Sequence, residues 1–363
     1  MSKGRILSIQ SHVAFGYVGG KAAVFPLQCL GYDVDVVNTV NFSNHSGYGR
    51  FGGSRASAAE LSQIFGIMEQ NVLLHPERLL TGYIPGGEAL SAITEIARKL
   101  RNRNPHLVYL LDPVLGDAGK LYVSPDVIPI YRGMLPLSTI ITPNWFEVEV
   151  LTDVKIVDVS SLQRALKTLH EEYHVPNVVI SSIPLRKWLL ESLPPHLQPP
   201  AGYRDSDTDF LLCIASSSDS PLKGDSLSAV HTRYIPCIPG YFSGVGDLFS
   251  ALVLAHYEPS TSPSASVNGS TDPGTEETTL SRAVSQALTK THAILSLTHE
   301  YAAALPEEDR QPTDEELDVK EPERLVRRMK GRELKLVQGQ DIIRNEAAVD
   351  HKNMDWWVKF WKP

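Results

Sequence analysis

Short runs of aliphatic and β-branched residues alternate with stretches of helical period along most of the chain. Residues 107–111 are apolar without interruption, which is typical of a strand buried on both faces of a sheet. Strands that alternate with helices predict βαβ units, and hence a mostly parallel sheet with helices on both sides. The other predicted strands are 5–10, 34–39, 79–83, 139–142, 178–182 and 210–215. The predicted helices are 58–70, 88–101, 161–174, 247–256 and 280–303.

Three segments interrupt this alternation. Residues 186–209 contain two Pro-Pro pairs and predict an extended insert, and residues 258–279 are rich in Ser, Pro, Thr and Gly and predict a disordered loop. Residues 306–330 are strongly charged and predict a mobile segment with a short helix at 323–329. We therefore expect the two inserts to be additions to one α/β domain.

The predicted domain organisation follows from these breaks. Residues 1–303 form the main α/β domain, and residues 304–345 form a charged segment that completes the fold. Residues 346–363 form a tail that is rich in tryptophan. Two alternatives stay open for this tail, because aromatic side chains can fold back on the body or dock onto a partner.

Composition allows a large core and limits the partners. Of the 363 residues, 42% are hydrophobic and 21% are charged, so global disorder is excluded. A net charge of −8 argues against a nucleic-acid surface, which needs clustered positive charge. It leaves a nucleotide substrate open, because a Gly-rich turn and a metal can hold phosphates locally.

The cysteines and the N-terminus indicate the compartment. Cys29, Cys213 and Cys237 lack the spacing of a disulfide framework or a zinc site. The sequence has no recognisable signal peptide and no apolar run long enough to span a bilayer. The expected location is therefore the cytoplasm, with access to the nucleus left open, and no membrane partner is expected.

The strongest local motif is Gly244-Val245-Gly246-Asp247, which precedes an apolar helix. Glycines let a backbone approach a ligand closely, and the N–H groups at a helix N-terminus can hold the charge of a phosphoryl group. Asp247 lies in the first helical turn, where it could accept a proton or only cap the helix. The motif predicts an anion hole with a carboxylate beside it.

Two further polar clusters follow predicted strands. Asp112 and Asp117 come directly after one strand, and Thr142, Asn144 and Glu147 come after the next. Carboxylates at strand ends can bind a metal, although turn formation is an alternative for the aspartates and helix-dipole stabilisation for Glu147. Because the carboxyl ends of parallel strands meet at one edge of a sheet, these clusters predict a common site.

The N-terminal half has different chemistry at its strand ends. Ser11 follows the first predicted strand, His45 and Ser46 follow the second, and Tyr83 ends the third. Hydroxyl groups, an imidazole and a phenol suit a small aromatic polar ligand better than a second nucleotide. A lone histidine is nevertheless more often structural than functional.

Taken together, these residues closely resemble the pyridoxal kinases of the ribokinase-like family of sugar and vitamin kinases. The resemblance runs from Arg5 to about Asn345, interrupted by the inserts. The Gly-x-Gly-Asp motif marks the wider family, whereas the N-terminal motifs are more specific for pyridoxal. The segments that carry the resemblance are residues 7–13, 16–19, 42–48, 81–83, 112–117 and 141–144.

The resemblance implies a ribokinase-like three-layer α/β/α fold with a mostly parallel central sheet. It also implies transfer of the γ-phosphoryl group of ATP to the 5′-hydroxyl of pyridoxal, and of pyridoxine and pyridoxamine. Mg²⁺ and K⁺ or another monovalent cation are the implied ions, and a homodimer is the implied assembly. Two alternatives stay open: a hydroxymethylpyrimidine or sugar kinase of the same family, and a non-catalytic carrier of B6 vitamers.

The resemblance assigns roles to individual residues. Asp247 is implied as the base that takes the proton of the 5′-hydroxyl. The implied vitamer-binding residues are Ser11, Val18, Phe42, His45, Ser46 and Tyr83. The implied ATP-binding residues are Asp112, Tyr122, Asn144, Ser182, Gly244, Val245 and Gly246. The implied Mg²⁺ residues are Asp112 and Glu147, and those of the monovalent cation are Asp117, Thr142 and Ser181.

One position departs from the family pattern inside the anion-hole motif. Val245 stands where many relatives have threonine. The backbone donors survive this change, but a hydroxyl group that could contact phosphate is lost. We therefore expect a modest loss of ATP affinity or rate relative to threonine at this position.

Overall fold

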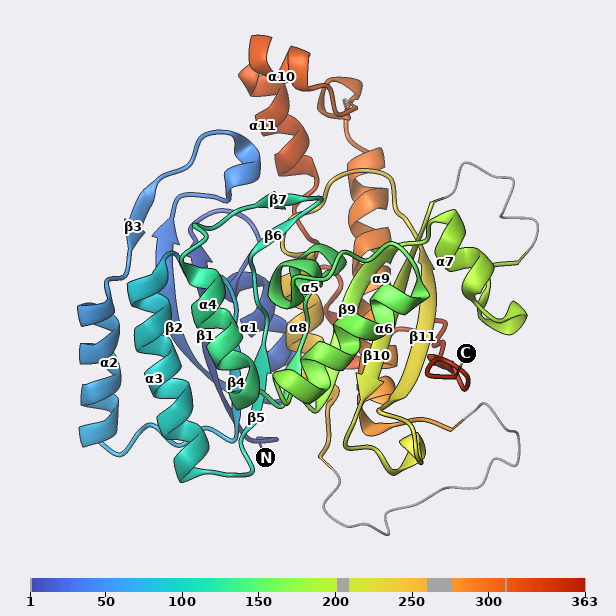
Figure 1. The fold of residues 1–363 in the computed structure, drawn as a ribbon. Coiled ribbons are helices and arrows are strands. Elements are labelled where there is room, and N and C mark those ends of the chain that lie inside the picture. The colour runs from blue at the N-terminus through green and yellow to red at the C-terminus, as the bar shows by residue number, and fades with distance from the viewer. Residues whose placement is uncertain (1, 201–208, 260–275, 311, 363) are drawn as a thin grey trace.

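The computed structural model describes residues 2–200, 209–259, 276–310 and 312–362. In this part of the chain, a sheet of ten strands has the order β12-β11-β10-β9-β8-β5-β4-β1-β2-β3, and helices cover both of its faces (Figure 1). The pairs from β2 to β9 are parallel, whereas β3 and the β10–β12 edge are antiparallel. The strands are β1 (Arg5–Val13), β2 (Asp33–Phe42), β3 (Gly53–Arg55), β4 (Arg78–Thr81), β5 (Val108–Leu111), β8 (Ile140–Ile141), β9 (Asn177–Pro184), β10 (Phe210–Ser217), β11 (Ala229–Pro236) and β12 (Asp355–Trp356).

Alternating side chains of the strands supply two cores. In β1, Leu7 and Ile9 pack into one core and Ile6 into the other, as the period of two in a strand requires. The first core lies under α2 (Ala58–Gln70), α3 (Gly87–Arg103), α4 (Val127–Met134), α5 (Trp145–Thr152) and α6 (Val159–Lys167). The second core lies under α1 (Gly20–Cys29), α8 (Val245–His256), α9 (Thr279–Ala303) and α12 (Gln340–Arg344). The three-layer fold predicted from the sequence is confirmed.

Most predicted elements are present. One predicted helix ends earlier than expected, and several elements of the structure were not predicted. Helix α2 has the predicted bounds because Ser57 and Glu60 form a capping box at its start. The predicted helix 161–174 ends as α6 at Lys167 and continues as a π-helical turn, Thr168–Glu172. Strand β11 and helices α1, α4 and α5 were not predicted. Among the described residues, no helix combines the length and apolar character needed to cross a lipid bilayer.

The first insert packs onto the body of the protein. Residues 187–192 form α7 (Lys187–Ser192), and the side chains of Leu189, Leu193 and Leu197 are buried in the first core. The prediction of an extended insert is therefore wrong for residues 186–200, because the leucines between the prolines anchor it. Residues 201–208 lie outside the described residues. So do residues 260–275, which make up most of the loop that was predicted to be disordered.

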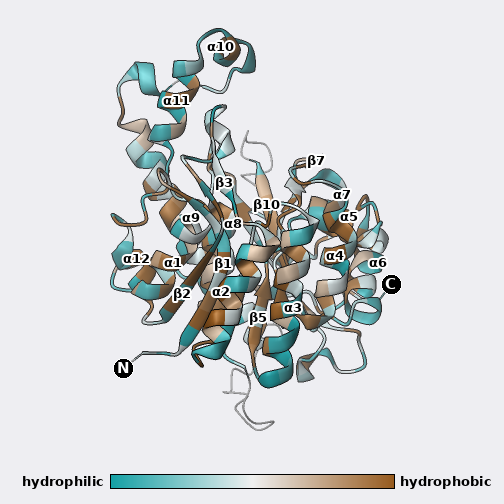
Figure 2. Cartoon of the chain, turned by 90° about the vertical axis from the view of Figure 1, so that its left-hand side faces the viewer, coloured by the Kyte–Doolittle hydropathy of each residue, from teal (hydrophilic) through white to brown (hydrophobic). Residues whose placement is uncertain are grey.

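The charged segment after α9 forms two helices that project from the body (Figures 1 and 2). The predicted helix at 323–329 is confirmed as α11 (Pro322–Gly331), and α10 (Glu315–Lys320) precedes it. The charged side chains pair with one another: Asp318 accepts hydrogen bonds from the buried guanidinium groups of Arg324, at 2.6 Å, and Arg328. These ion pairs join α10 to α11, and the predicted mobility of the segment stays a prediction.

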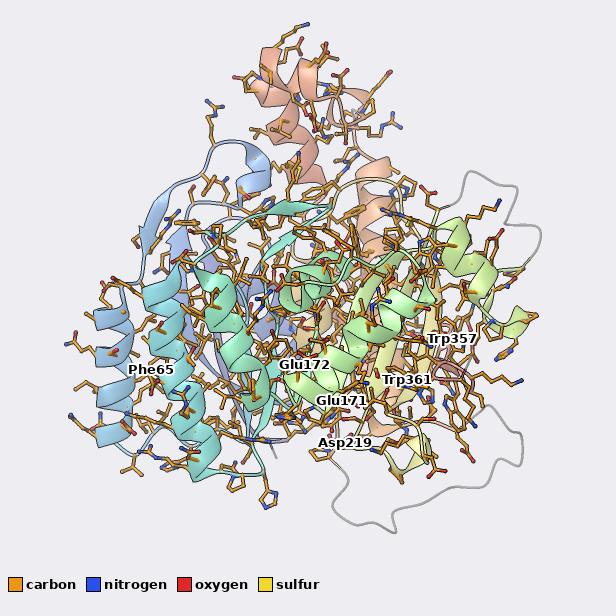
Figure 3. The ribbon with its side chains drawn as sticks, viewed as in Figure 1. Phe65, Glu171, Glu172, Asp219, Trp357 and Trp361 are labelled. Atoms are coloured by element: carbon orange, nitrogen blue, oxygen red, sulfur yellow. The ribbon has the colours of Figure 1, made fainter. Side chains whose placement is uncertain are left out.

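The tryptophan-rich tail folds back on the sheet, which is the first of its two alternatives. Strand β12 pairs with His231 and Thr232 of β11, and Trp357 and Phe360 are buried in the first core. The indole N–H of Trp361 donates to the carbonyl oxygen of Ser228 at 3.1 Å. Figure 3 shows Trp357 and Trp361 at the opposite end of the molecule from Phe65 of α2.

We expect Phe360→Ala to lower the free energy of unfolding by about 3–5 kcal/mol, because a buried phenyl ring leaves a cavity when it is removed. The ring of Phe360 is 2% exposed and contacts the rings of Trp357 and Trp361. Urea unfolding would measure the change. Val358→Ala is the matched control, because Val358 is 54% exposed and should cost no more than about 0.5 kcal/mol. Equal stability of the two variants would contradict the packing of the tail.

Candidate active site

The predicted anion-hole turn lies at the N-terminus of α8, against the loop that follows β1. Gly244 is the N-cap of α8 and has a φ of +79°. A Cβ atom at Gly244 would lie 2.0 Å from the carbonyl oxygen of Tyr17 and 3.2 Å from the Cα atom of Val18. Only glycine therefore lets this turn approach the loop closely. The contact places Val18, predicted to bind the vitamer, beside the turn predicted to bind phosphate.

Asp247 is held from another part of the chain. The backbone N–H of Gly19 donates to Oδ2 of Asp247 at 2.7 Å. The hydrogen bond that Asp247 accepts comes from the loop after β1 and not from the first turn of its own helix, so Asp247 does more than cap α8. Burial raises the pKa of the Asp247 carboxyl, and the hydrogen bond from Gly19 offsets part of this rise. A raised pKa makes this carboxylate a stronger base than an exposed aspartate.

Gly19 also contacts Ser11, the predicted ring-binding residue. A Cβ atom at Gly19 would lie 2.1 Å from the hydroxyl oxygen of Ser11 and 2.3 Å from its carbonyl oxygen. Gly19 has a φ of +54°, in the left-handed region that favours glycine. One glycine thus separates the side chains of Ser11 and Asp247, although 236 positions divide these residues in the sequence.

Asp112 lies at the end of β5 and is joined to α8 by hydroxyl groups. The hydroxyl of Ser250 is 3.0 Å from Oδ2 of Asp112, to which it donates. Ser250 is also 2.8 Å from the hydroxyl oxygen of Thr142, which follows β8. Burial, together with repulsion from the Asp247 carboxylate, raises the pKa of Asp112. The carboxylate of Asp112, which is buried, and that of Asp247, which is half-buried, are therefore close enough to repel each other.

Glu147 and Asn144 form a capping box at the start of α5. The Asn144 side chain accepts from the Glu147 N–H at 2.9 Å, and Oε2 of Glu147 accepts from the Asn144 N–H at 2.8 Å. Oε1 of Glu147 also accepts from the N–H of Leu115 at 2.9 Å. Burial and repulsion from Asp112 raise the pKa of the Glu147 carboxyl. Glu147 thus has the helix-terminal role named as its alternative, while its carboxylate remains beside Asp112.

The donor set at this rim fits a hard cation. Asp112 and Glu147 offer carboxylate oxygens, which Mg²⁺ prefers. Among the described residues, no three His, Cys, Asp or Glu side chains form a complete metal cluster. In kinases, one or two carboxylates commonly share Mg²⁺ with water and substrate phosphates.

The predicted monovalent-cation residues lie on three neighbouring elements. Asp117 ends β6 (Gly116–Asp117), which pairs with β7 (Lys120–Leu121), and its carboxylate accepts from the N–H of Ala118 at 2.7 Å. Thr142 follows β8, and Ser181 lies in β9, where its N–H donates to the carbonyl oxygen of Pro143 at 3.0 Å. These contacts are compatible with a cation site, and the site stays a prediction.

The remaining predicted residues are spread over the same rim. The ring of Phe42 lies tilted against that of Phe51, with ring centroids 5.5 Å apart, and the backbone carbonyl of Tyr83 accepts from the hydroxyl of Thr39 at 2.7 Å. On the nucleotide side, the predicted residue Ser182 lies in β9, and Tyr122 directly follows β7. Val245 and Gly246 lie in the first turn of α8. The side chain of Tyr122 is 56% exposed, as a residue over a bound nucleotide would be.

Sequence reasoning missed several residues of this rim. Gly19 was noted only as part of a motif, and Ser250 and Ser243 carried no signal of their own. Glu333 stands in a charged segment, and its hydrogen bond to His45 joins residues that are 288 positions apart. No local pattern marks Glu333 as buried, because Arg332 precedes it and it alternates with Leu334 and Leu336 as an exposed residue would.

A separate cavity of about 800 Å³ lies between β11, α9 and residues 347–353. Its lining includes Arg233, Pro236, His292 and Leu297, and none of the site residues predicted from the sequence. The cavity follows the edge of the sheet, whereas the predicted residues gather at the carboxyl ends of the parallel strands. The predicted chemistry therefore does not reside in this cavity.

Comparisons with known proteins agree with this geometry. Residues 76–189 match the model of the phosphomethylpyrimidine kinase family. A pyridoxal kinase of Arabidopsis thaliana is 41% identical over 253 residues, which cover 69% of this chain and 73% of that protein. A pyridoxal kinase of Ovis aries is 36% identical over 256 residues, which cover 69% of this chain and 76% of that protein.

A solved structure extends the similarity over the whole fold. The pyridoxal kinase of Leishmania donovani in complex with ADP and pyridoxamine superposes with a TM-score of 0.73 at 27% identity, covering 98% of this chain and 99% of that one. The layered sheet and the glycine turn beside a half-buried aspartate define a kinase with the ribokinase-like fold. Within that class, the chain belongs to the pyridoxal kinase family and is an enzyme of this kind. The non-catalytic carrier considered from the sequence is therefore set aside.

Proposed function

We propose that this enzyme transfers the γ-phosphoryl group of ATP to the 5′-hydroxyl of pyridoxal, and of pyridoxine and pyridoxamine, to form the 5′-phosphates. The observation that carries this proposal is the position of Gly19. Its N–H holds Asp247 at 2.7 Å, and its lack of a side chain admits Ser11. A ring bound at Ser11 would therefore place its hydroxymethyl group near the Asp247 carboxylate.

The proposed mechanism assigns one task to each part of the rim. Asp247 accepts the proton of the 5′-hydroxyl as its oxygen attacks the γ-phosphorus atom, and ADP leaves with the former bridging oxygen. The backbone N–H groups of Gly244, Val245 and Gly246 hold the charge on the transferring group. The burial of Asp247 supports its role, because burial raises its pKa and thereby its strength as a base.

The proposed Mg²⁺ and monovalent cation would lie near the negatively charged phosphates of ATP. Asp112, with Glu147 acting through water, would hold Mg²⁺, which neutralises charge on the phosphates of ATP. The repulsion between the buried carboxylates supports this assignment, because a cation would relieve it. We assign Asp117, Thr142 and Ser181 to K⁺ or another monovalent cation, and expect activity to depend on that ion.

The decisive experiment is the formation of pyridoxal 5′-phosphate from pyridoxal with MgATP and K⁺, followed by the absorbance of the product. Hydroxymethylpyrimidine and a sugar such as ribose, each at equal concentration, serve as competing substrates. Product formation that depends on ATP and is fastest with pyridoxal would support the proposal. Faster turnover of hydroxymethylpyrimidine would favour a hydroxymethylpyrimidine kinase instead. That candidate is supported by the match of residues 76–189 to the phosphomethylpyrimidine kinase model.

We further propose that the enzyme is a homodimer that buries the outer surface of α2. Ile64 and Ile67 on α2, and Val72 and Leu73 after it, are 44–70% exposed, and neighbouring apolar side chains of this kind mark an interface. Sedimentation velocity at micromolar concentration should give a dimer for the wild type and a weakened dimer for Ile67→Glu. A monomeric wild type would contradict the proposal, and Glu95→Gln on the exposed face of α3 is the control.

A further inference from the structure

Glu333 is a buried carboxylate that accepts hydrogen bonds from two loops of the predicted vitamer pocket. Its Oε2 accepts from the N–H of Tyr17 at 2.8 Å, and its Oε1 accepts from the hydroxyl of Tyr48 at 2.8 Å. Oε1 also lies 3.1 Å from Nε2 of His45. Glu333 is 7% exposed, and a buried carboxylate is costly unless such donors satisfy it.

The space for this carboxylate is provided by Gly16. A Cβ atom at Gly16 would lie 2.5 Å from Oε1 of Glu333, and Gly16 has a φ of +96° that favours glycine. Among the contacts of the described residues, the ion-pair partner of Glu333 is His45 and not a lysine or arginine. The carboxylate is therefore directed at the imidazole and the loops around it.

The contacts on both ring nitrogens define the tautomer of His45. Burial raises the pKa of Glu333, but the hydrogen bonds from His45, Tyr48 and Tyr17 outweigh it, so that the pKa lies below its ordinary value. An ionised carboxylate only accepts, so Nε2 of His45 carries the hydrogen. Nδ1 accepts from the N–H of Gly47 at 3.2 Å, which requires it to be unprotonated.

His45 also connects to the anion-hole turn. The hydroxyl oxygen of Ser243 lies 3.3 Å from Nδ1 of His45, and the hydroxyl donates because Nδ1 is unprotonated. Ser243 directly precedes Gly244. A chain of hydrogen bonds thus runs from Glu333 through His45 to the residue before the phosphate-binding turn.

Helix α11 packs onto the same loop. A Cβ atom at Gly47 would lie 3.1 Å from Cε of Met329, and one at Gly49 would lie 3.3 Å from a methyl group of Leu325. Figure 1 shows α11 beside the short helical turn that follows β2. The segment that carries Glu333 therefore covers the vitamer loop as well as bonding to it.

We propose that Glu333 is a positioning residue of the active site, which holds His45 in its Nε2–H tautomer and thereby sets the vitamer loop against the phosphate-binding turn. The proposal rests on the proposed function, because it assigns the His45 loop to the vitamer. It makes residues 304–345 part of substrate recognition. We expect the vitamer to be affected more than the nucleotide, since the three donors to Glu333 lie in the loops predicted to bind the vitamer, whereas the phosphate-binding turn is reached indirectly, through Ser243.

Glu333→Gln tests this proposal, because it keeps the size of the side chain and removes the charge. An amide cannot accept on both sides, so one of its contacts places an N–H₂ donor against a donor of the loops. We expect kcat/KM for pyridoxal to fall by about tenfold or more, as for the loss of a hydrogen bond to a charged group. The KM for ATP should change by less than about twofold. Glu323→Gln, an exposed acid on α11, is the matched control.

A spectroscopic readout separates positioning from a merely structural role. Two-dimensional ¹H–¹⁵N NMR of the imidazole rings, recorded without substrate and assigned with a His45→Asn variant, reports the tautomer of His45. The wild type should show the Nε2–H tautomer, and Glu333→Gln should show a mixture of tautomers. A wild type with the Nδ1–H tautomer would overturn the proposal even where the variant does not fold. So would a folded variant that keeps the wild-type tautomer, or one whose KM rises equally for both substrates.

These outcomes are separable from those of the proposed function. Failure of the wild type to phosphorylate pyridoxal would reject the proposed function, and the substrate-free NMR spectrum would still decide what Glu333 does to His45. A wild type that is active on pyridoxal, together with a Glu333→Gln variant of ordinary KM, would reject the positioning role alone.

Discussion

Asp247→Ala is expected to lower kcat for pyridoxal phosphorylation by about 10²–10⁴-fold, the usual contribution of a positioned general base. Without the carboxylate, the 5′-hydroxyl loses the proton acceptor that the proposed mechanism assigns to it. ATP affinity should change little, because the N–H groups of the Gly244–Gly246 turn and Asp112 remain. The loss should therefore fall on kcat and not on the KM for ATP.

Steady-state kinetics, together with ADP binding measured by calorimetry, would check this result. Asp225→Ala is the matched control, because Asp225 is exposed in the turn before β11, away from the predicted site. The pH profile adds a second check: the wild-type rate should fall on acidification at a pH above the ordinary carboxyl range, because burial raises the pKa of Asp247. Comparable turnover in Asp247→Ala would reject the assignment of the base.

Gly19→Ala is expected to lower kcat/KM for pyridoxal by about 10²-fold, although alanine adds only a methyl group. That methyl group would lie 2.1–2.3 Å from two oxygen atoms of Ser11, one of which belongs to the rigid backbone. Relief of the clash must move Gly19 away from Ser11, Asp247 or both. A displacement of about 1 Å in such a site is enough for a loss of this size.

Gly20→Ala provides a matched control one residue away. A Cβ atom at Gly20 would meet its nearest atom, the carbonyl oxygen of Ser11, at an ordinary 3.5 Å. Gly20 begins α1, where alanine is more favourable than glycine by about 0.5–1 kcal/mol. This variant should retain activity and unfold at an equal or slightly higher urea concentration. Equal activity of Gly19→Ala and Gly20→Ala would contradict the close approach of Gly19 to Ser11.

Local patterns predicted many elements of the fold well. Helix α2 has its predicted bounds, because its capping box lies within four consecutive residues. Strand β11 was missed, since it alternates polar and apolar residues only weakly and reaches its place through pairing with β10. The insert at 186–200 was predicted wrongly because its prolines can be read from the local sequence. The burial of its leucines depends on packing against the rest of the fold.

By itself, the sequence determined the class of fold and the motifs of the site, because strand and helix periods, glycine turns and strand-end carboxylates are local properties. Only the tertiary structure decided which of these residues meet. Gly19 and Asp247 are 228 positions apart, and Tyr17 and Glu333 are 316 positions apart, yet each pair shares a hydrogen bond. No local pattern encodes such pairs, because their distance depends on how the strands and helices between them pack.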